Sequence, residues 1–427
     1  MANSVDERVI GGHGEARRIQ EAGAGSGRAQ VRSAEINQKR LESGEAWEDF
    51  CGSLLEAGRL ILDAEQPDLP GLRAEGFRYL LGLVKVGVAQ AGELSDRDRP
   101  KWLRFQDSFS KWGAENADNH YLVTHIRSDA TYRITGTRGS CFTFLIEVGE
   151  GFMQLGDTAN FATLTADQIE VDSDGRFEIL ASRERQPGNW LPLDENARQI
   201  VIRQYFKDWE NEIPASFQID RVEDVGEPPA PLRSAEMARI LDDAANWVRT
   251  STEFWGTWIP ALRAQYMPGE MVPAVRYVGG ADDIRYGNDY YRLDEGDAMI
   301  VEFTPPNAQY WAIQLCDLWF VTTDYVNRLT SLNDSQLLLD ADGMCRVVIA
   351  HQDPGVPNWL DTAGATEGCL QYRYIWTQDN PLPSVRVVPF AELRDALPAE
   401  TPTVTPESRR RTIRARGRAV ARREQVG

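Results

Sequence analysis

Apolar residues recur at helical spacing in two stretches near the start of the chain. They fall three or four positions apart over residues 47–61 and again over 72–88, with the proline-containing break 67–70 between them. This spacing puts the apolar side chains on one face of a helix. The pattern predicts an antiparallel helix pair over 47–89 and a third amphipathic helix over 102–112.

After residue 121 the pattern changes to short runs in which apolar and polar residues alternate, separated by turn residues. A period of two is typical of strands that bury one face. The runs that predict strands are 131–134, 141–146, 177–180, 200–206 and 216–219. Several short strands with no helices between them favour a β sandwich or jelly roll over a parallel α/β sheet.

Both patterns then occur a second time. Helices are predicted over 234–249, with Ser234 as N-cap, and over 254–266. The strands predicted after them are 298–303, 310–315, 345–350 and 370–376. The predicted fold class is mainly β with α, with two tandem jelly-roll-like β sandwiches that are each preceded by helices.

The predicted boundaries follow these changes of pattern and composition. They are a mobile or loosely helical N-terminal segment 1–40, a helical region 41–112, a first β unit 113–225, a linker with helices 226–286, a second β unit 287–392 and a basic helical tail 393–427.

The two β stretches also repeat a motif. Asn189-Trp190 recurs as Asn358-Trp359, each after a Pro-Gly turn. Each copy is preceded by an Asp- and Gly-containing hairpin and followed by a strand that carries an arginine, Arg203 or Arg373. The two copies of the hairpin, of the Asn-Trp pair and of the arginine are 168, 169 and 170 residues apart, respectively. This regularity indicates two homologous β units in tandem.

Composition narrows the class of protein. With 427 residues, of which 42% are hydrophobic, the chain can form more than one buried core. Its net charge of −19 repels phosphate backbones, so no nucleic-acid partner is predicted. The longest apolar stretch, 79–89, is short and contains Lys85, so no membrane span is predicted.

The cysteines and the N-terminus bear on the location of the protein. Five cysteines without paired spacing predict reduced, mostly buried thiols, and the N-terminus shows no secretory signal, so a cytoplasmic location is predicted.

The C-terminal end of the chain is basic. From residue 406 onward it contains eight Arg and two Glu. Because the remainder of the chain is acidic, this helix is predicted to lie on its own protein or a sister subunit, with an outside partner as the alternative.

The run 349–364 resembles the C-terminal signature of the domain-of-unknown-function 1214 family, and so do Pro305-Pro306 with Tyr310-Trp311 and Asp317-Leu318-Trp319 with Asn333. Residues 132–136 and 188–192, with Asn119, look like a preceding unit related to the domain-of-unknown-function 1254 family. The resemblance covers roughly 72–423 and implies a pair of jelly-roll-like β domains found in bacterial proteins. It implies no mechanism. Ala365 stands where a polar residue, often His, is expected.

His351 is the candidate catalytic residue, because it follows a predicted strand and the first repeat has no His at the matching place. Asp353 or Asp361 would orient it as a general acid or base. In the alternative, His351 binds a backbone carbonyl and Asp353 caps a turn. With four His in the chain, and with His120 and His125 on opposite faces of a strand, no metal site and no cofactor are predicted.

The predicted ligand-binding residues are aromatic, amide and arginine side chains of the second β unit: Trp319, Tyr325, Asn327, Asn333, Asn358, Trp359 and Arg373. Asn358 and Trp359 recur in the first unit, so a shared structural role is the simpler interpretation for them. The functional hypothesis is an aromatic-lined pocket that binds, or binds and transforms, an amphipathic or carbohydrate-like organic molecule. The alternative is a non-catalytic binding or assembly protein, and a homo-oligomer is left open.

Overall fold

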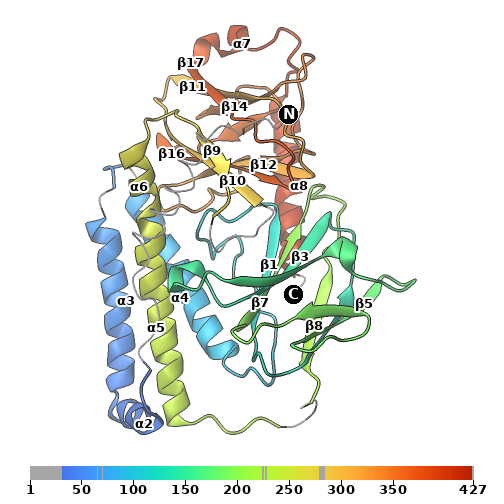
Figure 1. The fold of residues 1–427 in the computed structure, drawn as a ribbon. Helices are drawn as coiled ribbons and strands as arrows, with labels where there is room; N and C mark the ends of the chain where they lie inside the picture. The colour runs from blue at the N-terminus through green and yellow to red at the C-terminus, as the bar shows by residue number, and fades with distance from the viewer. Residues whose placement is uncertain are drawn as a thin grey trace, which may run out of the picture. The chain divides into compact units, whose positions relative to one another are not determined.

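The computed structural model describes residues 31–64, 66–69, 71–223, 226, 228–277 and 284–425. The chain divides into two compact units (Figure 1). The first unit holds the described residues up to 256 together with 414–425, and the second unit holds those in the range 257–413. Most of the segment 1–40, predicted to be mobile or loosely helical, lies outside the described residues.

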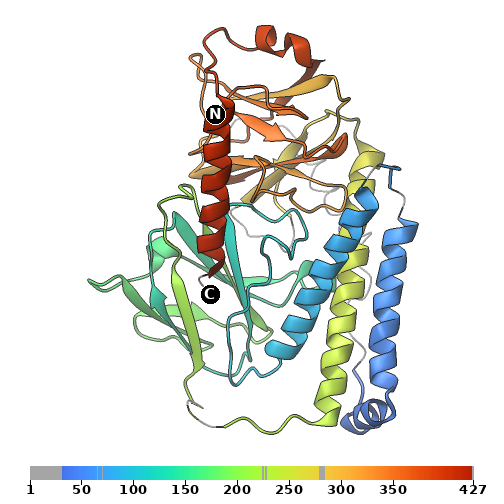
Figure 2. The same ribbon diagram turned by 180° about the vertical axis from the view of Figure 1, so that it is seen from behind.

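The helices of the first unit are α2 (Ala34–Ser43), α3 (Glu45–Asp63), α4 (Leu72–Glu93) and α5 (Ser234–Gly256), and α5 contacts the other three. In Figures 1 and 2, α3, α4 and α5 lie side by side. A small apolar cluster that includes Phe50 and Leu241 packs between them. Arg40 of α2 is 4% exposed and donates to Asp242 of α5 at 2.8 Å. The predicted helix pair is confirmed, and α2 shows that residues 34–40 are helical.

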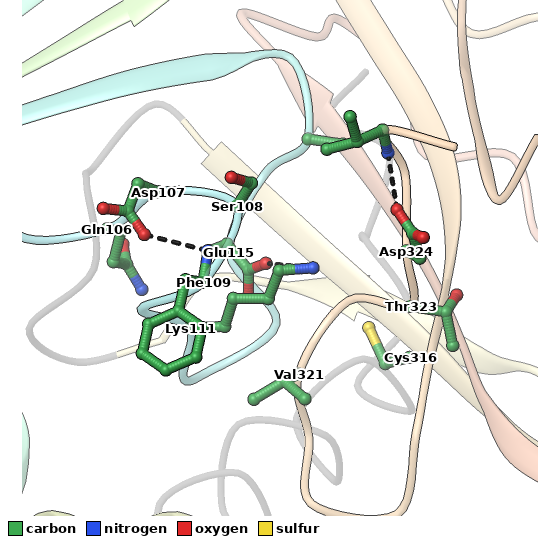
Figure 3. Close-up of polar contacts among 12 residues, drawn as sticks. Gln106, Asp107, Ser108, Phe109, Lys111, Glu115, Cys316, Val321, Thr323 and Asp324 are labelled. Carbon is green, nitrogen blue, oxygen red and sulfur yellow. Dashed lines mark hydrogen bonds and ion pairs between the residues drawn. The ribbon is translucent and has the colours of Figure 1, made fainter. Parts of the chain in front are cut away.

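The predicted helix over 102–112 is wrong. Leu103 pairs with Val123 in a β bridge, and Asp107 Oδ1 accepts hydrogen bonds from the backbone N–H groups of Phe109 and Ser110 at 2.9 and 2.6 Å. Figure 3 shows this turn, with Lys111 beside Glu115 just after it. A carboxylate that binds nearby backbone amides offers the chain an alternative to the helix, which explains the difference.

The first β sandwich lies in the first unit. Its strands are β1 (Asn119–His125), β2 (Tyr132–Thr137), β3 (Thr143–Gly149), β4 (Asn160–Thr165), β5 (Arg176–Ser182), β6 (Asn189–Pro192), β7 (Gln199–Tyr205) and β8 (Ser216–Arg221). They form two four-stranded sheets in the orders β1-β7-β3-β4 and β6-β5-β2-β8. Two short 3-10 helices, η2 (Met153–Leu155) and η3 (Ala166–Gln168), connect strands.

The second β sandwich lies in the second unit. After α6 (Trp258–Gln265), its strands are β9 (Val272–Val275), β10 (Ile284–Arg292), β11 (Asp297–Phe303), β12 (Tyr310–Cys316), β13 (Ser331–Asn333), β14 (Cys345–Ala350), β15 (Trp359–Asp361), β16 (Glu367–Ile375) and β17 (Ser384–Pro389). The sheet orders are β13-β12-β16-β10-β9 and β15-β14-β11-β17. Apolar side chains of both sheets, such as Ile300 and Leu370, form one core.

The two sandwiches have the same topology. Strands β1-β7-β3-β4 of the first sandwich correspond to β10-β16-β12-β13 of the second, and β6-β5-β2-β8 correspond to β15-β14-β11-β17. Strand β9 is the additional strand of the second sandwich. Arg203 lies on β7 and Arg373 on β16, which are equivalent strands. The Asp172 and Asp340 hairpins also match, because Gly175 and Gly343 each donate to the Asp carbonyl in a left-handed turn. The predicted repeat and fold class are confirmed.

After the second sandwich come η4 (Phe390–Glu392), α7 (Leu393–Ala396) and the arginine-rich helix α8 (Pro406–Gln425). Arg409 of α8 binds Asp353 at 3.0 Å and lies over the Trp359 ring in the second unit. Arg416 and Arg423 lie over the Trp209 ring in the first unit. The prediction that the basic tail lies on its own protein is confirmed.

Two further predictions concern cysteines and membranes. All five cysteines are free, and four of them are buried. Among the described helices, none has both the length and the apolar character that a membrane crossing requires.

Candidate functional site

His351 has hydrogen bonds at both ring nitrogens. Nε2 lies 3.1 Å from the Leu293 carbonyl, which can only accept, so Nε2 carries the proton. Nδ1 lies 2.7 Å from Thr362 Oγ1, a hydroxyl that can donate or accept. Thr362 and Leu293 therefore hold the ring, and neither Asp353 nor Asp361 is hydrogen-bonded to it. These contacts support the structural alternative for His351.

The two carboxylates predicted to assist His351 have other partners. Asp353 caps its own loop through the Gly355 N–H at 2.9 Å and forms an ion pair with Arg409. Asp361 accepts from Arg328 at 2.8 Å and from the Ala363 N–H at 2.8 Å. The structure does not bring the three predicted catalytic residues together as a hydrogen-bonded group.

Asn358 and Trp359 have the same contacts as their counterparts in the first repeat. Asn358 accepts from the Leu338 N–H at 2.9 Å and donates to the carbonyls of Leu338 and Arg346. Asn189 makes the same three bonds with Glu170 and Glu178. The indole N–H groups of Trp359 and Trp190 donate to Ala350 and Ser182, which are equivalent carbonyls. Both residues therefore close a loop in each sandwich.

Two of the remaining predicted ligand residues lie in one row of the second sandwich. Arg373 of β16 and Asn333 of β13 flank Ala312 of β12, and all three are buried. Arg373 donates to Gln371 and lies 5.6 Å from the Tyr286 ring centre. Arg373 and Asn333 thus lie in one row of buried residues across this sheet.

The other three predicted ligand residues lie in the segment between β12 and β13. Trp319 and Tyr325 are 2% and 5% exposed. Asn327 donates its side-chain amide to Asp324 at 3.0 Å. Asp324 also accepts from the backbone N–H of Val326, and Figure 3 shows this bond. Asp324 therefore organises a local turn that includes Asn327.

A cavity of about 680 Å³ lies in the first unit, where α4 and α5 approach one end of the β1–β7 strand pair. We call it the arginine cavity. It is lined by Arg97, Arg198 and Arg239, by His125 of β1 and Gln199 of β7, and by Trp247 of α5, among others. Gly87 of α4 permits this arrangement, because a Cβ there would lie 2.7 Å from the Trp247 ring. None of the residues predicted as a site lines this cavity.

Three guanidinium groups lie near one another at the arginine cavity. Partial desolvation and the charges of Arg239 and Arg198 lower the pKa of Arg97. Arg239 is neutralised by Asp243, 2.6 Å away on the same helix. Within the described ranges, neither the Arg97 nor the Arg198 side chain forms an ion pair. Two arginines near one another that form no ion pair favour a bound anion.

Four carboxylates also line the arginine cavity: Glu150, Asp157, Asp242 and Asp243. Asp242 is already paired with Arg32 and Arg40 at 3.1 and 2.8 Å. Burial raises the pKa of Asp243, the charge of Arg239 opposes this, and the charge of Asp242 adds to it. Asp242 and Asp243 already have cationic partners, and Asp243 also acts electrostatically on Arg97. Among the described residues, none of the four carboxylates forms an ion pair with Arg97 or Arg198.

His125 and Gln199 face each other across the β1–β7 pair. Burial lowers the pKa of His125 to about 4, the charge of Arg97 adds to the effect, and a hydrogen bond to the Leu94 backbone opposes it. The imidazole is therefore neutral at physiological pH. His120, five residues earlier, contacts Arg104 and Gln204 instead, so the two histidines have separate surroundings, as their spacing predicts.

Two buried N–H donors belong to residues that line the arginine cavity. Gln90 Nε2 and Trp247 Nε1 have no acceptor among the described residues, although both side chains are at least 96% buried. Buried donors without acceptors are costly, so an acceptor-rich ligand or water would be favoured nearby. Groups of three or more His, Cys, Asp or Glu arranged for a metal ion do not occur in the described part of the chain.

Comparison with known proteins gives a family and a fold. The model of the family described as "Protein of unknown function (DUF1214)", the domain-of-unknown-function 1214 family of the sequence analysis, matches residues 125–207 and 283–379. These two ranges fall in the first and the second sandwich. The predicted similarity of the first sandwich to the 1254 family is not shown. Curated proteins give no match.

Among solved structures, an uncharacterized protein from Burkholderia cenocepacia is 31% identical, with a TM-score of 0.79 over 83% of this chain and 99% of that one. The VPA0106 protein from Vibrio parahaemolyticus is 12% identical over 74% of this chain and 98% of that one, with a TM-score of 0.42. The family match in both sandwiches and the extended similarity to the Burkholderia protein show that the chain belongs to the DUF1214 family of proteins of unknown function.

Proposed function

We propose that the protein binds a small amphipathic organic anion in the arginine cavity. The observation that carries the proposal is the presence of two arginines, Arg97 and Arg198, that line one cavity without an ion-pair partner among the described residues. A carboxylate that reaches both would form charge-assisted hydrogen bonds, which are about twice as strong as neutral ones. The cavity volume of about 680 Å³ is within the usual range for small-molecule sites.

The amphipathic character follows from the aromatic wall. Trp247 lines the arginine cavity and packs edge-on against Phe152, with ring centres 5.2 Å apart. Phe152 lines the same cavity. An apolar part of the ligand would remove these rings from water while its acidic group reaches the arginines. Of the two predicted ligand classes, amphipathic and carbohydrate-like, the proposal keeps the amphipathic one, with a site in the first unit instead of the second.

Asymmetry between the repeats supports this site. The positions of His125, Arg198 and Gln199 correspond in the second sandwich to Tyr290, Gly368 and Cys369, by strand register. The arginine cavity therefore has no equivalent set of side chains in the second sandwich. Asymmetry alone does not identify a site, because His351 is also unrepeated and has structural contacts. Transformation of the ligand by acid–base chemistry, the bacterial origin and the cytoplasmic location stay predictions.

The experiment is a thermal-shift screen of small carboxylates, repeated with Arg198→Ala. A ligand at 100 times its dissociation constant stabilises the fold by about 2.7 kcal/mol. Loss of one charge-assisted contact should weaken binding about 30-fold. Arg73→Ala is the matched control, because Arg73 is exposed on α4 and does not line the arginine cavity. Carboxylates that bind equally well to wild type and to Arg198→Ala would contradict the proposal.

A second candidate function is self-association. Helices α3 and α4 contact each other and carry exposed large apolar residues, among them Trp47 and Leu55 on α3 and Phe77 and Leu81 on α4. Exposed large apolar residues on neighbouring helices can form an interaction surface, and a symmetric pair of such helix pairs forms a four-helix bundle. Light scattering should give a dimer mass for wild type and a monomer mass for the double variant Leu55→Glu, Leu81→Glu. A wild-type monomer would exclude this function.

A further inference from the structure

We infer that the anion in the arginine cavity carries a hydroxyl group, so that the ligand class is a hydroxycarboxylic acid. This inference rests on the proposed function and deepens it. It follows from two uncharged acceptors, one on His125 and one on Gln199, that lie opposite each other at the end of the β1–β7 pair and line the same cavity as the arginines.

The first acceptor is a ring nitrogen of His125. The Leu94 N–H already donates to Gln90, so the Leu94 group that binds the imidazole is the carbonyl. A carbonyl only accepts, and the imidazole must therefore donate its single N–H to it. The second ring nitrogen is left with a lone pair, and within the described residues it has no hydrogen-bond partner.

The second acceptor is the side-chain oxygen of Gln199. Gln199 Nε2 donates to the Gly151 carbonyl at 2.9 Å, which fixes the orientation of the amide because a carbonyl cannot donate. Oε1 is then the other end of the amide, and Gln199 lines the arginine cavity. Two backbone carbonyls, those of Leu94 and Gly151, therefore fix two neighbouring side chains so that each keeps an acceptor.

The positive charge of nearby arginines determines which hydrogen-bond donor of a ligand can bind to these two acceptors. Arg97 and Arg239 are close enough to His125 to lower its pKa, so an ammonium group would be repelled there. A hydroxyl group donates a hydrogen bond without carrying a positive charge. The same ligand can then place its carboxylate on the unpaired arginines, its hydroxyl on His125 or Gln199 and its apolar part on Trp247.

The test uses matched pairs of acids that differ by one hydroxyl group: lactate and propionate, 3-hydroxybutyrate and butyrate, and mandelate and phenylacetate. Calorimetric titration of the full chain should show that at least one hydroxy acid binds about tenfold more tightly than its partner, since one hydrogen bond contributes about that factor. His125→Phe should reduce this preference to less than about twofold while binding of the acid without the hydroxyl is kept. His125→Gln, which keeps an acceptor, should retain part of it.

The two claims fail in different ways. If no member of any pair binds, or if binding is insensitive to Arg198→Ala, the proposed function itself is overturned. If the acids bind through Arg198 but each pair binds equally, the anion site stands and the hydroxyl inference is overturned. A preference that persists in His125→Phe and is lost in Gln199→Met assigns the hydroxyl to Gln199. If the preference persists in the double variant, the inference is wrong.

Discussion

The two β sandwiches share their strand order and differ in what equivalent sheets carry. In the first, Glu147 of β3 pairs with Arg203 of β7 at 2.6 Å beside two valines, Val123 and Val201. In the second, the places of Val123, Val201 and Glu147 hold three buried amides: Asn288, Gln371 and Gln314. The two sandwiches therefore share a backbone topology but carry different side chains at equivalent positions.

The loops of the two sandwiches, in contrast, keep the same side-chain contacts. Asn189 and Asn358 make the same three backbone hydrogen bonds, and Trp190 and Trp359 donate to equivalent carbonyls. What recurs in both sandwiches holds the fold together. What occurs once, such as His125 with Arg198, is where ligand chemistry is expected.

The largest expected effect comes from a core position that differs between the repeats. Asp289 of β10 is fully buried and corresponds to Thr124 of β1. Burial raises the pKa of Asp289 to about 7, the Gly269 N–H opposes this, and the charge of Glu270 adds to it. Because the folded-state pKa lies above the unfolded value, the stabilisation is complete below pH ~4 and is lost as the pH rises through about 7.

Asp289→Asn should remove this pH dependence. The wild type is expected to lose up to about 4 kcal/mol of unfolding free energy between pH 4 and 8 through this one group. Denaturant titrations of both proteins across that range measure the difference. Asp294→Asn, at an exposed position of the same unit, is the control. Parallel pH profiles for wild type and Asp289→Asn would show that the buried carboxyl contributes nothing.

The loop-closing asparagines give the next largest effect. Asn358→Ala removes the amide that binds the N–H and carbonyl of Leu338 and the carbonyl of Arg346. Because Asn358 itself is 8% exposed, water replaces these bonds poorly, and the cost is about 3 kcal/mol. Asn189→Ala should cost about 1 kcal/mol, because that loop is half exposed and water can replace the amide. Unfolding free energies measure both. Equal stability of Asn358→Ala and wild type would reopen a ligand role for Asn358.

His351 and its counterpart Arg183 provide a smaller contrast. His351→Ala removes the donor of the Leu293 carbonyl and should lower the unfolding free energy by about 1.5 kcal/mol. Arg183 is exposed, with Glu195 3.8 Å away, so Arg183→Ala should change it by less than about 0.5 kcal/mol. Binding of small carboxylates should be unaffected by either change. A His351→Ala variant that is fully stable yet has lost ligand binding would restore the catalytic hypothesis for the second unit.

The sequence predicted the fold well where local pattern decides it. Alternating runs such as 345–350 became strands, and the Asn-Trp repeat gave the tandem architecture. The alternating pattern does not predict strand β10, because Gly287, Asn288 and Asp289 interrupt its apolar residues, although these three residues are buried. The helix expected over 102–112 has helical spacing, but Asp107 binds the following backbone amides and the segment stays irregular.

The candidate site was predicted poorly because its residues are not neighbours in sequence. Arg97, His125, Arg198 and Arg239 come from a loop, two strand ends and a helix, and only strand pairing and the packing of α5 join them. No local motif marks them. The available signal is weak: neither His125 nor Arg198 recurs as the same residue type in the second repeat, but the same is true of His351 in the first.

The most direct test of the difference between the repeats is carboxylate binding to the double variant Arg97→Ala, Arg198→Ala, measured by titration calorimetry beside Arg73→Ala. Both arginines are exposed and unpaired among the described residues, so the unfolding free energy should change by less than about 0.5 kcal/mol. We expect affinity for the best-binding carboxylate to fall at least about 100-fold in the double variant and to stay unchanged in Arg73→Ala. Undiminished binding in the double variant would contradict the assignment of function to the first unit.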